Sequence, residues 1–203
     1  MIKTTTDIEI TQKISLFQKD LKGIFTTADL YNIIGSPNPI TNQRTIKRLV
    51  KAGILSPVKR GLYVTDSFDL WQLSRHIINN AYISLDSILA KNMLIGTLPQ
   101  NRLSLVSTNK NLVIRFKNYR IDIYSLSDDL FFGFTQNNQG LNLADSEKAY
   151  LDMLYYHLRG YKFAIDPRNE INIQKLNKTK IRSYLIKYKN PKFVTFVKGL
   201  ING

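Results

Sequence analysis

A basic segment at residues 41–60 carries six Lys or Arg side chains and no Asp or Glu. Within it, Ile46, Leu49 and Val50 recur at the spacing of one helical face. At about 100° per residue, the basic side chains fall on roughly the opposite face. They are Arg44, Lys47, Arg48 and Lys51. A helix with this arrangement buries its apolar stripe and presents its cations to the phosphates of a nucleic acid.

Single residues indicate the ends and the first turn of this helix. Thr41 is the expected N-cap, because its hydroxyl can accept a hydrogen bond from an amide of the first turn. Gly53 is the expected residue after the C-terminus, where a left-handed conformation costs a glycine little. In a helix-turn-helix, the first turn of the second helix reaches base edges in the major groove. Asn42 and Gln43 occupy that turn and can pair with adenine, as Arg44 can with guanine.

Short elements flank the basic helix on both sides. A helix over 27–34, with Thr27 as its expected cap, precedes it after a turn that contains two prolines at 36–39. A two-strand hairpin with a basic tip follows it over 54–64. Two short helices, a tight turn and a hairpin in this order are typical of a winged helix-turn-helix.

The predicted DNA-binding residues are the first turn, the cationic face and the hairpin tip. They are Thr41, Asn42, Gln43, Arg44, Thr45, Lys47, Arg48, Lys51, Lys59 and Arg60. The alternative is a solvated or protein-binding winged helix, since ordinary surface helices are also charged. The absence of any acidic residue from the segment favours DNA. Most contacts of this kind go to phosphate and position the protein without reading sequence.

Composition narrows the class of protein. The chain has 203 residues and a formal net charge of +14, which favours polyanionic partners, nucleic acid first among them. It has no cysteine, so it forms no disulfide and no thiolate metal site. No apolar run approaches the roughly 18 residues of a membrane span, and residues 1–7 lack the apolar core of a signal peptide. We therefore expect a cytoplasmic protein with no membrane partner.

A second basic region lies near the C-terminus. Residues 157–203 hold eleven basic and two acidic side chains, whereas residues 81–156 are neutral. The predicted second basic surface comprises Lys175, Lys178, Lys180, Arg182, Lys187 and Lys189. Aromatic residues alternate with these lysines, and their helical spacing favours core positions over a binding surface.

The periodicity of the whole chain predicts an α+β protein of two domains. An N-terminal winged helix-turn-helix over 1–80 is followed by a mixed α/β domain over 81–203, with a small, mainly antiparallel sheet and C-terminal helices. The other expected helices cover 7–22, 67–79, 84–94, 145–158, 171–176, 181–188 and 190–201. The expected strands cover 103–108, 112–117, 120–126 and 130–134.

The titratable residues argue against catalysis. The chain has two histidines, His76 and His157, each inside a predicted helix and without a ligand-spaced partner. A metal-dependent nuclease is the remaining enzymatic hypothesis, with Asp122 and Glu147 as its carboxylates. Glu147 lies in the first turn of a predicted helix, where it favours the helix dipole. We expect no enzyme, no metal and no cofactor.

Four segments resemble the AbiEi family of antitoxins, from bacterial type IV toxin–antitoxin and abortive-infection modules. They are the winged helix ending Arg60-Gly-Leu-Tyr-Val64, then Tyr82-Ile-Ser-Leu-Asp-Ser-Ile-Leu89, then Arg120-Ile-Asp-Ile-Tyr124 with Leu130-Phe-Phe-Gly133, and Leu143-Ala-Asp-Ser-Glu-Lys-Ala-Tyr-Leu-Asp-Met-Leu154. The second is similar to the family's ISLESAL and the fourth to its IATPEKALLDLL. Asp145 and Ser146 replace the usual Thr/Ser-Pro, and a capping role survives that change.

The resemblance implies a repressor with two functions. The winged helix would bind inverted repeats in double-stranded promoter DNA and repress its own operon. The C-terminal domain would neutralise a nucleotidyltransferase-like toxin, with or without direct binding. The basic helices after residue 170 would face toxin, nucleic acid or a second copy, and we expect a monomer or weak dimer in solution. The competing hypothesis is a stand-alone winged-helix repressor whose C-terminal domain dimerises or senses a ligand.

Overall fold

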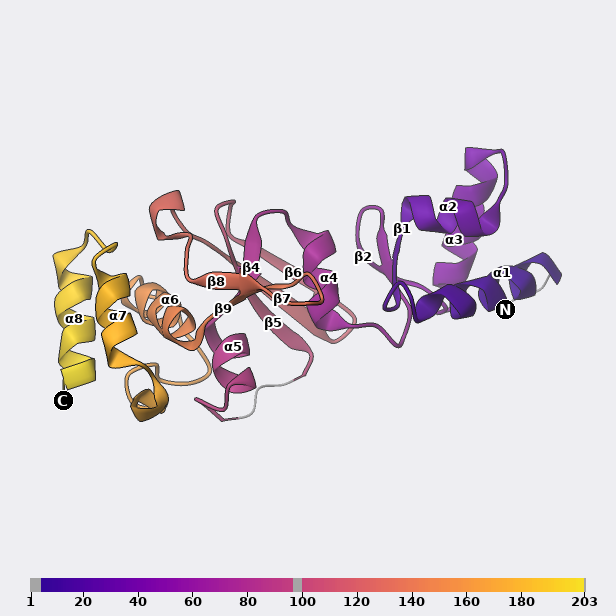
Figure 1. The fold of residues 1–203 in the computed structure, drawn as a ribbon. Coiled ribbons are helices and arrows are strands. Elements are labelled where there is room, and N and C mark those ends of the chain that lie inside the picture. Colours follow the sequence, from indigo (N-terminus) through magenta and orange to yellow (C-terminus); the bar gives the residue numbers. More distant parts are fainter. Residues whose placement is uncertain (1–4, 97–99, 203) are drawn as a thin grey trace. The chain divides into compact units, whose positions relative to one another are not determined.

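The computed structural model describes residues 5–96 and 100–202, which form two compact units (Figure 1). The first unit contains the described residues up to Ile77 together with Ile114–Arg120. The second contains the described residues of 78–113 and of 121–203. The molecule is α+β, with helices and a small sheet in the first unit and a larger mixed sheet in the second.

The first unit alternates short helices with a three-stranded antiparallel sheet in the order β1-β3-β2. Its elements are α1 (Thr5–Gln18), β1 (Ile24–Thr26), α2 (Thr27–Ile34), α3 (Pro39–Lys51), β2 (Ser56–Lys59), β3 (Leu62–Val64) and α4 (Leu70–Ile77). Their core is the cluster Ile10, Ile14, Phe25, Leu30, Ile33, Ile46, Leu49 and Leu55. Strands β2 and β3 are joined by a tight turn and form a hairpin.

Two details of the first unit differ from the sequence prediction. The helix expected over 7–22 ends at Gln18. Phe17, near the end of this helix, is 47% exposed. The chain turns because Gly23 N donates to Gln18 O, and Lys22 adopts a positive φ of 52°. The cap of α2 is Thr26 instead of Thr27, since Thr26 and Asp29 bond reciprocally as a capping box.

The second unit contains the larger sheet, which has six strands in the order β6-β7-β5-β4-β9-β8 and has helices packed against it; the end of β6 and the start of β7, Ile114–Arg120, belong to the first unit. Its elements are β4 (Ala81–Ile83), α5 (Leu85–Lys91), β5 (Arg102–Ser107), β6 (Leu112–Phe116), β7 (Tyr119–Ser125), η1 (Asp128–Leu130), β8 (Phe134–Gln136), β9 (Asn142–Ala144), α6 (Ser146–Leu158), η2 (Ile173–Lys175), α7 (Lys178–Leu185) and α8 (Pro191–Asn202). The β4–β9 pair is parallel, which makes the sheet mixed. Helix α6 contacts α5, α7 and α8 (Figure 1).

Local predictions in the second unit were partly wrong. The strand expected over 130–134 is a 3-10 turn, η1, followed by β8. The helix expected over 171–176 is only the 3-10 turn η2. Strands β4 and β9 were missed, because three residues are too few to show an alternating pattern. The capping role expected at Asp145 is confirmed, because its carboxylate accepts a hydrogen bond from Lys148 N. At the start of α8, the side-chain oxygen of Asn190 accepts one from Lys192 N.

A buried ion pair lies at the centre of the second unit. Lys148 Nζ and Asp152 Oδ1 are 2.5 Å apart on one face of α6, and both side chains are fully buried. Tyr82 and Ser84, from β4 and its end, donate hydroxyl hydrogen bonds to Asp152 Oδ2 at 2.9 and 2.8 Å. Burial lowers the pKa of Lys148 and raises that of Asp152, and the attraction between the two charges opposes both shifts.

Residues of three sequence motifs meet at this ion pair. Tyr82 and Ser84 belong to the segment 82–89, Lys148 and Asp152 to the segment 143–154, and Gly133 to the segment 130–133. Gly133 has a φ of +73°, and a Cβ there would lie 2.9 Å from Lys148 Cβ. The ring of Phe132 lies 4.6 Å from Lys148 Nζ. The motifs are therefore parts of one buried structure, which explains why their residue types go together.

Removing one partner of this pair should destabilise the protein strongly. We expect Lys148→Met to lower the free energy of unfolding by about 3–5 kcal/mol, because it leaves a buried carboxylate without its counter-charge. The double variant Lys148→Met, Asp152→Asn should recover much of that loss, since Tyr82 and Ser84 can still donate to the amide oxygen. Urea denaturation followed by circular dichroism measures both. A single variant as stable as the wild type would contradict the prediction.

Candidate nucleic-acid interface

Helix α3 begins two residues before the predicted cap. Asn38 is the N-cap, and its side-chain oxygen accepts a hydrogen bond from Ile40 N at 2.9 Å. Pro39 occupies the first helical position, where its missing amide hydrogen costs nothing. The expected cap, Thr41, therefore lies inside the first turn. At the other end Ala52 is the C-cap, and Gly53 follows with a φ of +77°, as predicted.

The phase of α3 agrees with the sequence prediction. Ile46 and Leu49 are 3% and 1% exposed and join the core of the first unit. The basic side chains lie on the other side of the helix and are exposed; they are Arg44, Lys47, Arg48 and Lys51. The core contacts of α3 therefore decide which of its side chains can meet a partner.

Two of the predicted contact residues are buried. Asn42 and Thr45 are 3% and 2% exposed, because they share the face of Ile46 and Leu49. Asn42 Nδ2 donates to Ser36 O at 3.0 Å and so ties α3 to the turn before it. Neither side chain is available to a base. Extending the apolar stripe backwards at i−4 from Ile46 and Leu49 would have placed both on the buried face.

Arg48 has a structural partner as well as an exposed position. Its Nη2 atom lies 2.7 Å from Asp7 Oδ1 on α1, and the Asp7 side chain is only 8% exposed. The same nitrogen donates to Thr45 Oγ1 at 3.3 Å. Arg48 thus joins α1 to α3, a role that its spacing in α3 could not indicate because Asp7 is 41 residues away.

The two basic residues at the hairpin tip, Lys59 and Arg60, have different surroundings. Lys59 Nζ donates to Ile77 O at 2.7 Å, at the end of α4, so this ammonium group is tied back to the unit. Arg60 is exposed in the turn, and Gly61 follows with a φ of +78°. Thr27 N donates to Gly61 O at 3.0 Å, which fixes the turn against the first residue of α2.

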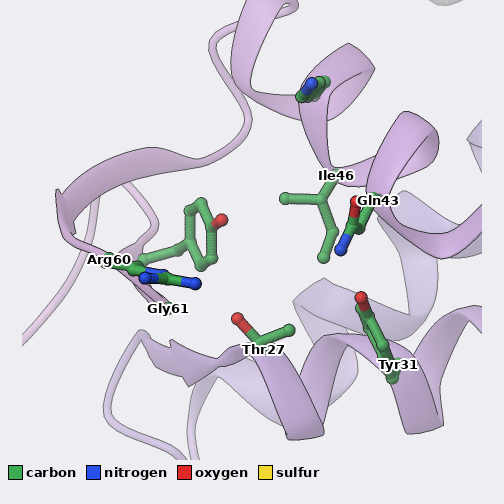
Figure 2. Close-up of a pocket in the computed structure, with 8 residues that line it drawn as sticks. Thr27, Tyr31, Gln43, Ile46, Arg60 and Gly61 are labelled. Carbon is green, nitrogen blue, oxygen red and sulfur yellow. The ribbon is translucent and has the colours of Figure 1, made fainter. Parts of the chain in front are cut away.

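A hollow of about 350 Å³ lies between α2, α3 and the β2–β3 turn, and we call it the α2–α3–hairpin hollow. Figure 2 shows Thr27 and Tyr31 on α2, Gln43 and Ile46 on α3, and Arg60 extending from the hairpin toward the space between them. Its lining residues are Thr27, Tyr31, Gln43, Ile46, Lys47, Arg60, Gly61 and Tyr63. None of these is acidic, and Gln43, Lys47 and Arg60 belong to the predicted DNA-binding set.

The second predicted basic set is largely engaged within its own unit. Lys180 Nζ lies 3.1 Å from Asp145 Oδ2 and 3.3 Å from Glu147 Oε2. Lys189 forms an ion pair with Asp129. Two other basic side chains donate hydrogen bonds, Arg182 to the Asn202 side chain and Lys175 to Met93 O. The ammonium group of Lys187 lies 4.2 Å from the centre of the Phe132 ring. Lys178 is exposed. Fewer basic side chains of this set are therefore free to meet a partner than the net charge of the region indicates.

The carboxylates of the nuclease hypothesis also have structural roles. Glu147 Oε1 accepts a hydrogen bond from Asn177 N at 2.9 Å. Asp122 Oδ2 lies 3.4 Å from Arg102 Nη2. Among the described residues no group of three His, Cys, Asp or Glu side chains is arranged to hold a metal ion.

In the same part of the chain, no helix combines the length and the apolar character that crossing a membrane requires.

Part of the first unit matches a known protein family. Residues 12–65 match a family model described as transcriptional regulator, AbiEi antitoxin. The match extends from α1 to the residue after β3 and includes α3 and the hairpin, and it confirms the resemblance found in the sequence for this part of the chain. No curated protein matches the chain.

The fold as a whole is similar to a solved structure. The RV2827C protein from Mycobacterium tuberculosis, known from a crystal structure, matches with a TM-score of 0.65 at 11% sequence identity. The alignment covers 98% of this chain and 77% of that chain. At this identity the likeness concerns the fold alone, and it spans both units.

Burial of Asn42 predicts a loss of stability on its replacement. We expect Asn42→Ala to lower the free energy of unfolding by about 1 kcal/mol, because it removes the donor to Ser36 O. The matched control is Gln43→Ala, an exposed neighbour, which should change stability by less than about 0.5 kcal/mol. Thermal or urea denaturation of both variants measures the difference. Equal stabilities would show that Asn42 does not fix the turn.

Proposed function

We propose that the chain is a DNA-binding transcriptional regulator of a toxin–antitoxin module, and that its first unit is a winged helix-turn-helix. The observation that carries this proposal is the exposed cationic face of α3, within the residues that match the AbiEi regulator model. In such a module α2 and α3 form the helix pair, and the β2–β3 hairpin is the wing.

Different parts of α3 are placed to contact bases and phosphates. Gln43 and Arg44 are exposed in its first half, where a recognition helix reaches base edges. Lys47 and Lys51 continue the same exposed side and are placed to contact phosphates. Arg60 supplies the cation of the wing. Asn42, Thr45 and Lys59 are left out, because burial or a hydrogen bond within the unit occupies them.

For the second unit we propose neutralisation of a nucleotidyltransferase-like toxin without enzymatic activity of its own. The support is the family match of the first unit together with the three AbiEi-like motifs that meet at the Lys148–Asp152 pair. Binding to inverted repeats in the chain's own promoter would couple the level of the toxin to that of the regulator.

Charge removal from α3 tests DNA binding. We expect Arg44→Gln with Lys51→Gln to weaken binding to a duplex from the promoter at least tenfold at about 0.15 M salt, and to lower the slope of log affinity against log salt by about 2. Fluorescence anisotropy measures both. The control variant Lys13→Gln, Lys19→Gln removes the same charge from α1 and its end and should change affinity far less. Equal losses of affinity in the two variants would show that only the net charge of the chain matters and not its position on α3.

Rescue of growth tests the antitoxin activity. We expect expression of the adjacent gene to arrest a bacterial host, and co-expression of the full chain to relieve the arrest. The Arg44→Gln, Lys51→Gln variant should relieve it as well when expressed from an unrelated promoter, because neutralisation is assigned to the second unit. Failure of the wild-type chain to relieve the arrest would leave a DNA-binding repressor with no toxin.

A further inference from the structure

We propose that the α2–α3–hairpin hollow binds one backbone phosphate of double-stranded DNA together with the sugar attached to it. This inference rests on the proposed function and deepens it. It adds Thr27, Tyr31 and Tyr63 to the interface, none of which the basic pattern of the sequence indicated. It also gives the wing a fixed contact instead of a loose electrostatic one.

The hollow has rigid walls. The bond from Thr27 N to Gly61 O, 3.0 Å long, joins the start of α2 to the wing turn. A Cβ at Gly61 would lie 3.4 Å from Thr27 Oγ1, which is ordinary van der Waals contact and places the turn directly beside α2. The φ of +78° at Gly61 suits glycine best. The backbone of the turn that carries Arg60 is therefore held beside α2 before any ligand arrives, which reduces the entropy lost on binding.

The lining has the chemistry of an anion site with an apolar floor. Lys47 and Arg60 supply positive charge, one from α3 and the other from the β2–β3 turn. Thr27, Tyr31 and Gln43 carry neutral donors that can bond phosphate oxygens. Tyr63, which is half-buried beside the core residue Ile46, provides apolar ring surface for a sugar. With no acidic residue in the lining, nothing repels a phosphodiester.

The position of the hollow favours a DNA phosphate over a free one. Lys47 belongs both to the lining and to the exposed cationic face of α3. A backbone that follows this face therefore reaches the hollow without a break in positive charge. A contact of this kind carries no sequence information but fixes the register of α3, so that Gln43 and Arg44 meet defined base pairs.

A scan with neutral phosphates tests the proposal on the full chain. A series of promoter duplexes carries one methylphosphonate each, which removes the charge of a single phosphate. Affinities are measured by anisotropy for the wild type, Arg60→Gln and Tyr31→Phe; the last variant removes only a hydroxyl. The control is Lys13→Gln on α1, an exposed lysine outside the hollow.

We expect one phosphate per half-site at which the modification costs the wild type about tenfold but costs Arg60→Gln less than about twofold. Arg60→Gln should also lower the salt slope by about 1 without changing the preference for promoter over scrambled DNA. Tyr31→Phe should show the same coupling to that phosphate at smaller size. Lys13→Gln should show additive losses at every position.

If the losses from Arg60→Gln and from the methylphosphonate add at every position, the hollow is not a phosphate site. The proposed function would still stand in that case, provided that the wild-type chain binds the promoter. A wild-type chain that does not bind the promoter would overturn both. Calorimetric titration with inorganic phosphate and with a nucleoside monophosphate separates the remaining source of the anion. We expect no binding below millimolar concentration; micromolar binding that competes with DNA would replace the proposal with a small effector.

Discussion

The Lys148–Asp152 ion pair is the interaction on which the second unit depends. A lysine and an aspartate with no exposure to water are stable only when the remaining polar atoms are also satisfied. Tyr82 and Ser84 provide that satisfaction from β4, and Tyr188 accepts from Lys148 Nζ at 3.3 Å beyond the end of α7. The pair therefore connects the sheet, α6 and the C-terminal helices. Each partner requires the others, which gives the motifs of this unit a common physical cause.

The first unit has the corresponding constraint in α3, which serves the core and the surface at once. Ile46 and Leu49 bury one face and so determine that Arg44, Lys47 and Lys51 are exposed. Arg48 adds a tie to Asp7 on α1, and the bond between Thr27 N and Gly61 O ties the wing turn to α2. These contacts fix the position of α3 against α1 and of the β2–β3 turn against α2.

Charge in the sequence does not translate directly into a binding surface. The basic residues near the C-terminus and those of α3 look alike as sequence, yet Lys180, Lys189 and Arg182 of the former have partners within the second unit. Exposed pairs of this kind contribute little to stability, but they lower the positive potential that a polyanion would meet. This difference supports α3 and the wing, rather than the C-terminal helices, as the surface for nucleic acid.

The sequence alone determined the α+β class, the phase of α3, the capping role of Asp145, and the AbiEi resemblance, which the family match confirms over residues 12–65. These features depend on local spacing and on single capping residues. Only the tertiary structure decided that Lys59 donates to Ile77 O and that Arg48 meets Asp7. It also formed β4 and β9 and the α2–α3–hairpin hollow. The physical reason is that each of these features joins residues that are distant in the chain. No local pattern indicates which distant residue will be the neighbour.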